Sequence, residues 1–266
     1  MNDEPLLVSE RHGAVALLRL NIPARLNPLT MPLQQALRAA LAELREDRSV
    51  RALLITGTGK AFCVGADLGA MSAPDNGSLG AQTADAMEAL SNRLIEDLRS
   101  LPFPVVSAVN GACAGAGVGV ALAADVVLAA RAAYFYLPFM PRLGIVPDLG
   151  TTWFLERNVG RARAVALSLL GERLGAEQAA QWGLVWQCVD DADLPAQALA
   201  VAQRLAALPA HAAQELRAVY ELAGRQTLTE QMRSEAERQR ELIDRPTFAE
   251  GVQAFLGKRE PVFPQR

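Results

Sequence analysis

The sequence predicts an α/β protein in which strands alternate with helices. Two observations support this prediction. Short, continuously apolar runs recur through the first half of the chain, and segments with leucines at helical spacing lie between them. Strands that are apolar along their whole length are typical of sheets covered on both faces. The last third of the chain has helical patterns with short breaks, so we expect an α/β core followed by a helical region.

The expected strands are four runs rich in leucine or β-branched residues, at 14–20, 51–57, 104–111 and 125–130. Two helices are expected between them, at 32–47 and 83–100, from the recurrence of Leu33, Leu37, Leu41 and Leu44, and of Met87, Leu90, Leu94 and Leu98.

The segment 71–80 has the composition of a mobile surface loop. From residue 161 onward the pattern is almost entirely helical. We therefore predict a core over 1–200 and a helical region over 201–266 that packs on the core or on a neighbouring subunit and serves oligomerisation.

Composition excludes several classes of function. The chain of 266 residues is 51% hydrophobic and carries a net charge of only −3, so nothing suggests nucleic-acid binding. The N-terminus lacks a basic region followed by an apolar core, and Asp125 interrupts the longest apolar run, so neither a secretory signal nor a membrane span is expected. Cys63, Cys113 and Cys188 are widely separated, which favours reduced thiols, a cytoplasmic location and no metal site.

Three kinds of chemistry that single residues or short motifs could suggest are not favoured. The two histidines, His12 and His211, have no neighbouring nucleophile, which argues against histidine-dependent catalysis. The Gly-Lys pair at 59–60 is followed by Ala61 rather than Ser or Thr, so it is not a phosphate loop. The glycine-rich segment 115–120 lacks both the third glycine and the later acidic residue of a dinucleotide site.

The same glycine-rich segments allow another interpretation. Gly65-Ala66 and Gly115-Ala116-Gly117 stand at the expected starts of two helices, where small side chains leave backbone N–H groups uncovered. Two such N–H groups converging on one carbonyl oxygen would form an oxyanion hole. Tight packing of helices on a sheet explains the small residues equally well, so the residues alone leave both interpretations open.

Asp148 is the one carboxylate in the nearly uncharged run 143–155. It has two interpretations of equal weight on the residues alone. Aspartate is a preferred N-cap residue and could begin a helix. Alternatively, burial among Ile145, Val146, Leu149 and Trp153 would raise its pKa and make it a better proton acceptor.

Taken together, five segments resemble the enoyl-CoA hydratase/isomerase (crotonase) superfamily: "LNIPARLNPLT" (20–30), "AFCVGADL" (61–68), "VSAVNGACAGAGVGVALAADVVLAA" (106–130), the segment 143–191 that begins "LGIVPDLGTTWFLE", and "EGVQAFLGKREPVF" (250–263). The resemblance covers nearly the whole chain. It implies a crotonase-like spiral of βαβ turns with a C-terminal helical region, assembled as a homotrimer or a hexamer. It also implies an acyl-CoA thioester substrate and no cofactor, since coenzyme A is part of that substrate.

The resemblance also implies site residues. The N–H groups of Ala66 and Ala116 correspond to the oxyanion donors. Ala24, Arg25 and Leu26 match the loop that lies along coenzyme A, and Asp67 and Leu68 lie beside the acyl end, where Asp67 has mainly a structural role. Lys258 and Phe263 fall in a segment that approaches coenzyme A in relatives, often that of an adjacent subunit.

Catalysis by a single aspartate follows from two further points of the resemblance. Gly119 and Met140 stand where hydratases of the family carry glutamates, and Met140 is assigned to substrate binding instead. The segment around Asp148 is most similar to isomerases of phenylacetate degradation, in which an aspartate at this position is the acid/base group. We therefore predict isomerisation of an enoyl-CoA or epoxyphenylacetyl-CoA thioester. The alternatives are a hydratase of broad specificity and a non-catalytic acyl-CoA-binding or RNA-associated member.

Overall fold

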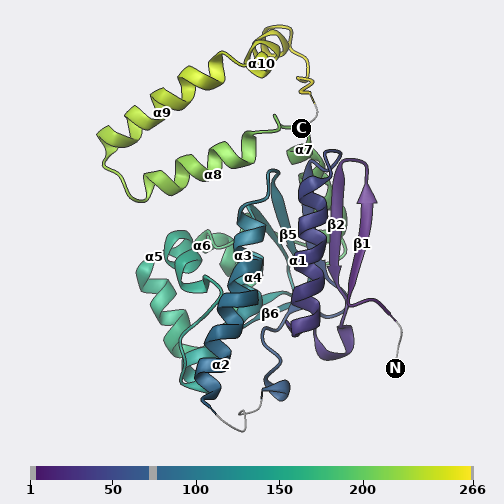
Figure 1. Ribbon diagram of the computed structural model, residues 1–266, viewed down its shortest axis with the longest axis vertical. Helices are drawn as coiled ribbons and strands as arrows, with labels where there is room; N and C mark the ends of the chain where they lie inside the picture. The colour runs from purple at the N-terminus through teal and green to yellow at the C-terminus, as the bar shows by residue number, and fades with distance from the viewer. Residues whose placement is uncertain (1–3, 72–76, 265–266) are drawn as a thin grey trace.

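The computed structural model describes residues 4–71 and 77–264 and contains two sheets (Figure 1). The larger sheet has six strands in the spatial order β1 (Leu7–His12), β2 (Val15–Leu20), β3 (Ala52–Gly57), β5 (Val105–Val109), β7 (Val126–Ala130) and β10 (Gln187–Val189). The smaller sheet has the order β4 (Ala61–Cys63), β6 (Ala112–Ala114), β8 (Tyr134–Tyr136) and β9 (Leu174–Gly175). All strand pairs are parallel except β1–β2 and β8–β9.

The helices follow the strands in a repeating order. They are α1 (Met31–Glu46), α2 (Leu79–Ala86), α3 (Asn92–Arg99), α4 (Ala116–Leu122), α5 (Thr151–Leu170), α6 (Ala176–Trp182), α7 (Leu194–Ala206), α8 (Ala212–Ala223), α9 (Leu228–Ile243) and α10 (Pro246–Leu256). Three successive turns each give one strand to the large sheet and the next to the small one: β3 and β4, β5 and β6, β7 and β8. This is the predicted α/β spiral.

Local sequence explains the first helix. Thr30 is its N-cap and accepts a hydrogen bond from the N–H of Leu33, which satisfies one of the free donors at the helix start. Leu33, Leu37 and Leu41 are all buried, so the leucine spacing marks the face that packs on the sheet.

The four predicted strands are confirmed as β2, β3, β5 and β7. The predicted helix at 83–100 is part of a longer helical segment, in which α2 and α3 are joined by a π-helical turn, Met87–Ser91. One expectation is wrong: Gly65-Ala66 precede only a single 3₁₀ turn, Leu68–Ala70. The segment after residue 161 is mostly helical, as predicted, and adds only the short strands β9 and β10. Residues 72–76 of the expected mobile loop lie outside the described residues.

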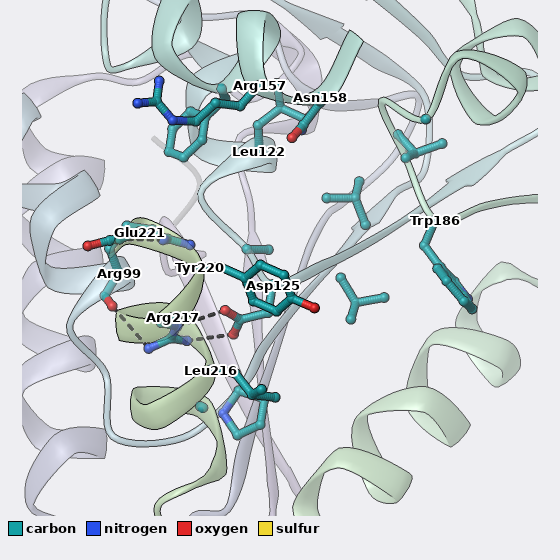
Figure 2. A pocket seen from close by; sticks show the side chains of 18 of the residues that line it. Arg99, Leu122, Asp125, Arg157, Asn158, Trp186, Leu216, Arg217, Tyr220 and Glu221 are labelled. Atoms are coloured by element: carbon teal, nitrogen blue, oxygen red, sulfur yellow. Dashed lines mark hydrogen bonds and ion pairs between the residues drawn. The ribbon is translucent and has the colours of Figure 1, made fainter. Parts of the chain in front are cut away.

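The C-terminal helices form a separate layer. Figure 1 shows α8, α9 and α10 (green to yellow) beyond the end of the sheet. The boundary predicted at residue 200 falls within α7, which packs against β3 and β5. A cavity of about 890 Å³ lies between α8 and the ends of α4 and β7, and Figure 2 shows Trp186 and Tyr220 among its lining side chains.

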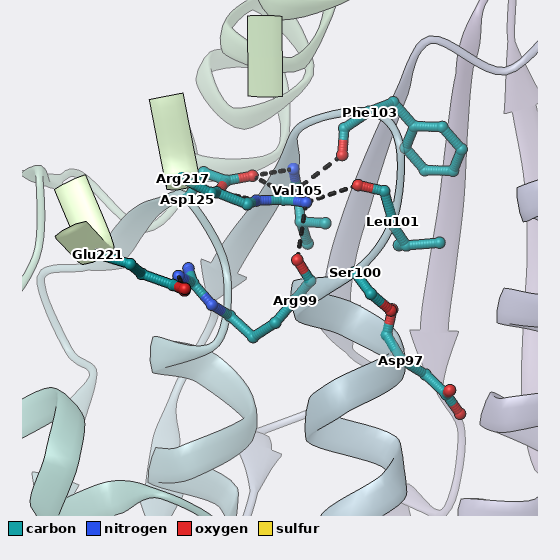
Figure 3. A network of polar contacts seen from close by, with 9 residues as sticks. All are labelled: Asp97, Arg99, Ser100, Leu101, Phe103, Val105, Asp125, Arg217 and Glu221. Carbon is teal, nitrogen blue, oxygen red and sulfur yellow. Dashed lines mark hydrogen bonds and ion pairs between the residues drawn. The ribbon is translucent and has the colours of Figure 1, made fainter. Parts of the chain in front are cut away.

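Arg217 joins α8 to the core beside this cavity. The Arg217 guanidinium donates hydrogen bonds to the main-chain oxygens of Arg99, Leu101 and Phe103, at 3.0, 2.6 and 3.1 Å (Figure 3). It also forms a two-pronged ion pair with Asp125, at 2.7 and 2.5 Å. The Arg217 side chain is only 9% exposed, so α8 is held to the core by a largely buried charge pair.

Candidate active site

The pairing of two short strands brings together the loops that contain Ala66 and Ala116. Strands β4 and β6 are parallel neighbours, so the loops at their carboxyl ends meet at the same edge of the small sheet. A methyl group built on Gly65 would lie 2.8 Å from the amide nitrogen of Ala116 and 3.0 Å from the oxygen of Ala114. Gly65 also has φ +87°, so glycine is required there on both counts.

The amides of Ala66 and Ala116 share one property. Neither donates a hydrogen bond to another main-chain group in the described part of the chain. Ala116 is the first residue of α4 and is 4% exposed, whereas Ala66 is exposed and stands just before the 3₁₀ turn. Free N–H groups in two touching loops are the kind of donors that can stabilise a negatively charged oxygen.

Asp148 begins a tight turn that leads into α5. Its main-chain oxygen accepts a hydrogen bond of 2.9 Å from the N–H of Thr151. The two central residues, Leu149 and Gly150, have φ of +47° and +73°. The N-cap of α5 is Gly150, with no side-chain cap, so the interpretation of Asp148 as the N-cap residue is wrong.

This turn packs against the helix that starts at Ala116. Gly119 is three residues further along α4, on the same face as Ala116 and about one helical turn away. A methyl group built on Gly119 would lie 2.4 Å from the oxygen of Leu149 and 3.1 Å from Oγ1 of Thr151. The turn that carries Asp148 therefore lies within about one helical turn of the Ala116 amide.

The Asp148 carboxyl is shielded from water without being neutralised. Its Oδ1 is buried and has no hydrogen-bond partner among the residues described. Burial raises the pKa of Asp148 to about 6, while its own backbone N–H acts in the opposite direction. The rise in the pKa agrees with expectation, but only some of the residues that were expected to bury the carboxyl do so. Leu149 is 5% exposed, as expected for a residue that buries the carboxyl, whereas Ile145 and Val146 are exposed.

The loop that contains Ala24, Arg25 and Leu26 is held next to Asp67. Nη2 of Arg25 lies 2.5 Å from Oδ1 of Asp67. The buried Asn27 fixes the base of the loop, because its side-chain amide donates to the oxygens of Thr58 and Ala61 and its Oδ1 accepts from the N–H of Ile22.

The ion pair gives Asp67 a structural partner, as expected for a residue that supports the site. Ala24, Arg25, Leu26 and Leu68 are exposed beside it. Met140 is exposed in the π-helical turn Phe139–Leu143. The Phe139 ring next to Met140 reaches to 3.9 Å from the Cβ position of Gly115, so Met140 neighbours the second donor loop. Their roles toward a substrate stay predictions.

Sequence reasoning missed two residues of this site. Gly119 stood out only as the absence of a glutamate, yet it makes the close contact with Leu149. Thr151 did not stand out, yet it is fully buried and its hydroxyl has no partner in the described part of the chain. The alternation of glycines at 115, 117 and 119 is the signal that could have indicated close approach of another backbone.

Other features lie elsewhere. The 890 Å³ cavity has none of Ala66, Ala116 and Asp148 in its lining, and its lining includes Trp153. Phe263 lines a second cavity, of about 380 Å³, and Lys258 follows α10. Within residues 4–71 and 77–264, no group of three or more His, Cys, Asp or Glu could hold a metal ion. No helix in the same ranges is long and apolar enough to cross a membrane.

Comparisons with known proteins agree with this architecture. Residues 10–266 match the family model described as enoyl-CoA hydratase/isomerase. The 1,2-epoxyphenylacetyl-CoA isomerase of Escherichia coli (strain K12) is 40% identical over 263 residues, covering 97% of both chains. A protein of Rhodobacter capsulatus named "probable enoyl-CoA hydratase" is 41% identical over 252 residues, covering 95% of both. A solved enoyl-CoA hydratase from Polaromonas sp. JS666 superposes with a TM-score of 0.89 at 32% identity, covering 97% of this chain and 99% of that one.

Proposed function

The chain belongs to the enoyl-CoA hydratase/isomerase family, and from that premise we propose that it isomerises an enoyl-CoA or epoxyphenylacetyl-CoA thioester with Asp148 as its single proton carrier. One observation carries the proposal. The buried, unpartnered Oδ1 of Asp148 sits on a turn packed about one helical turn from the free amide of Ala116. The relative named 1,2-epoxyphenylacetyl-CoA isomerase supports the substrate class.

In this proposal, the substrate lies across the two donor loops. Ala24, Arg25 and Leu26 contact the coenzyme A portion, while Leu68 and Met140 contact the acyl chain. The Arg25–Asp67 ion pair holds the coenzyme A loop beside the first donor. The thioester oxygen accepts hydrogen bonds from the amides of Ala66 and Ala116. No cofactor is needed beyond the coenzyme A that the substrate brings.

The proton transfer consumes no water. In a 3-enoyl thioester, the Asp148 carboxylate takes a proton from C2, the electron pair moves toward the thioester oxygen, and a dienolate forms. The Ala66 and Ala116 amides stabilise that oxygen, each by roughly 10²–10³-fold in rate. Asp148 then returns the proton to C4, which leaves a 2-enoyl thioester and the original carboxylate. The same parts suit the ring expansion of an epoxyphenylacetyl thioester.

The pKa of about 6 suits this role. At neutral pH most of the carboxyl is ionised and able to accept a proton. It is also more basic than an ordinary aspartate, because water does not solvate its charge fully.

A hydratase of broad specificity is the second candidate, and the Rhodobacter capsulatus relative favours it by name. Addition of water to a double bond calls for two carboxylates that hold and split one water molecule. In this chain Gly119 and Met140 occupy the corresponding positions, and the space beside Gly119 is filled by the backbone of Leu149. The contact supports isomerisation over hydration.

The test compares Asp148→Asn with wild type on three substrates: a 3-enoyl-CoA, the epoxyphenylacetyl thioester and crotonyl-CoA. We expect wild type to isomerise at least one of the first two, and we expect Asp148→Asn to lower kcat by about 10²-fold or more while KM changes little. Asp193→Asn, an exposed residue at the start of α7, is the matched control and should leave kcat unchanged.

Three results would contradict the proposal. Rapid hydration of crotonyl-CoA would identify a hydratase. Undiminished isomerisation by Asp148→Asn would remove this residue from the mechanism. Tight binding of the thioesters by wild type, with no turnover of any of them, would instead identify a non-catalytic acyl-CoA-binding member.

A further inference from the structure

We infer that Gly119 is a positioning residue for Asp148: its lack of a side chain allows the strained turn Asp148–Thr151 to seat against α4 and so places the carboxyl next to the donor loops. This inference rests on the proposed function and extends it to a residue that touches neither the substrate nor the reacting atoms. Three independent features of the turn support it.

The first feature is the closeness of the contact. A Cβ at position 119 would lie 2.4 Å from the oxygen of Leu149 and 3.0 Å from its Cβ. The nearest atom belongs to the backbone and cannot rotate away, as the end of a long side chain could. Any residue larger than glycine at 119 must therefore push the turn away from α4 or displace the helix.

The second feature is strain beside the carboxyl. Leu149 has φ +47°, a left-handed conformation that is unfavourable for a residue with a Cβ. Such conformations persist only where the surroundings enforce them, and they concentrate at functional sites. The enforcing contacts here are burial of the Leu149 and Thr151 side chains and the hydrogen bond from Thr151 N–H to the oxygen of Asp148.

The third feature is the lack of hydrogen-bond partners for two side-chain atoms of the turn. Oδ1 of Asp148 and Oγ1 of Thr151 are both buried and have no partner in the part of the chain that is described. No side-chain hydrogen bond of these atoms therefore fixes the carboxyl. Its position depends on packing, and Leu149 and Thr151 of the turn pack closely against α4 at Gly119.

A consequence concerns specificity. Hydratases of the family are expected to carry a glutamate at position 119. A glutamate there would need the space that the Leu149 backbone now fills, so it is incompatible with the present position of the turn and of Asp148. Gly119 is therefore a switch position between the two chemistries, and adding the glutamate alone would displace the aspartate rather than supplement it.

The test is Gly119→Ala, with Gly251→Ala as the matched control. Both glycines lie within helices, α4 and α10, but a methyl group on Gly251 would meet nothing within 4 Å. We expect Gly119→Ala to lower kcat for the isomerised thioester by about 10²-fold, the size of effect that a misplacement of about 1 Å produces, with little change in KM. Gly251→Ala should match wild type.

A second readout separates positioning from a general loss of structure. The pKa of the Asp148 carboxyl can be measured by infrared difference titration against Asp148→Asn. No residue of α4 is ionisable, α5 has no acidic residue in its first turn, and Arg142 in the π-helical turn is exposed, so this pKa reports burial of the carboxyl. We expect Gly119→Ala to move the pKa from about 6 down toward the ordinary aspartate value, because the displaced carboxyl gains water.

The inference is wrong if Gly119→Ala keeps both kcat and the pKa of wild type. Should Gly119→Ala fail to fold, Gly150→Ala tests the same turn without touching α4. The backbone at position 150 has φ +73°, and a methyl group there would lie 3.1 Å from the Phe154 ring. We therefore expect the same fall in kcat and the same fall in the pKa of Asp148. Full activity of Asp148→Asn would overturn the proposed function, whereas loss of activity in Asp148→Asn together with an unaffected Gly119→Ala would overturn this inference alone.

Discussion

Asp148 combines burial, a missing hydrogen-bond partner and a strained neighbour within three residues. Each of these features lowers the stability of the folded chain, and none of them improves packing. Such a concentration of unfavourable terms is expected where a protein holds a reactive group in place for chemistry. At the scale of single residues, the fold therefore accepts a local loss of stability at this carboxyl.

This loss predicts how stability depends on pH. The pKa of Asp148 is raised from 3.8 to about 6, so between these values the folded chain binds more protons than the unfolded chain. The contribution of this group to stability is complete below pH 3.8 and is lost as the pH rises through about 6. Asp148→Asn removes the effect.

We therefore expect the variant to gain stability relative to wild type as the pH rises from about 4 to 7, by on the order of 3 kcal/mol at most. Urea unfolding of both proteins across this range measures the difference. A difference that does not change with pH would show that the carboxyl is solvated in the folded chain.

At the scale of elements, α8 is attached to the core chiefly through the largely buried Arg217, with the Arg99–Glu221 ion pair beside it. The Arg217 guanidinium donates from all its nitrogens, to Asp125 and to main-chain oxygens at and just after the end of α3 (Figure 3). Asp125 also accepts from the N–H of Val105, so the same carboxylate joins β5, β7 and α8.

Arg217→Met tests this attachment. Removing one partner of a largely buried pair leaves the Asp125 charge uncompensated, and we expect a loss of about 3 kcal/mol in the free energy of unfolding, with the C-terminal helices cut first in limited proteolysis. The control is Arg93→Met, which breaks the exposed Arg93–Glu96 pair on α3 and should cost less than about 0.5 kcal/mol. Equal losses from both changes would show that the buried network has no special role.

Element prediction from the sequence was uneven for a physical reason. Strands β2, β3, β5 and β7 are five or six residues long and mostly apolar, so the sequence makes them recognisable. Strands β4, β6 and β8 have three residues each, too few for any periodicity to appear. These short strands nevertheless set the site, because the pairing of β4 with β6 brings the two donor loops together.

On the scale of the whole molecule, the C-terminal helices expose large apolar side chains. Tyr220, Leu228, Phe255 and Leu256 are all more than 70% exposed, and Phe255 reaches 84%. A soluble monomer rarely leaves a large contiguous apolar surface uncovered. This supports the proposal, implied by the family, that the chain assembles as a homotrimer or a hexamer through its C-terminal region.

Phe255→Glu tests the assembly. If α10 lies in a subunit interface, a charge at this position should shift the mass in sedimentation toward that of a monomer, because an unpaired charge is costly to bury. Leu6→Glu changes an exposed leucine just before β1 and should leave the mass unchanged. A wild-type protein that sediments as a monomer would refute the proposed assembly outright.

The sequence by itself determined the α/β class, the main strands, the amphipathic helices and the candidate residues Ala66, Ala116 and Asp148. The spacing of apolar residues shows which face of a helix or strand is buried, and this can be read from a short stretch of sequence. Glycine and alanine likewise indicate positions where two backbones approach closely. Only the tertiary structure decided that Asp148 is not the N-cap of α5, that Asp67 pairs with Arg25, and that Gly119 seats the turn. Each of these depends on contacts between segments about 30 or more residues apart, or on a backbone conformation that packing enforces, and no local pattern records either.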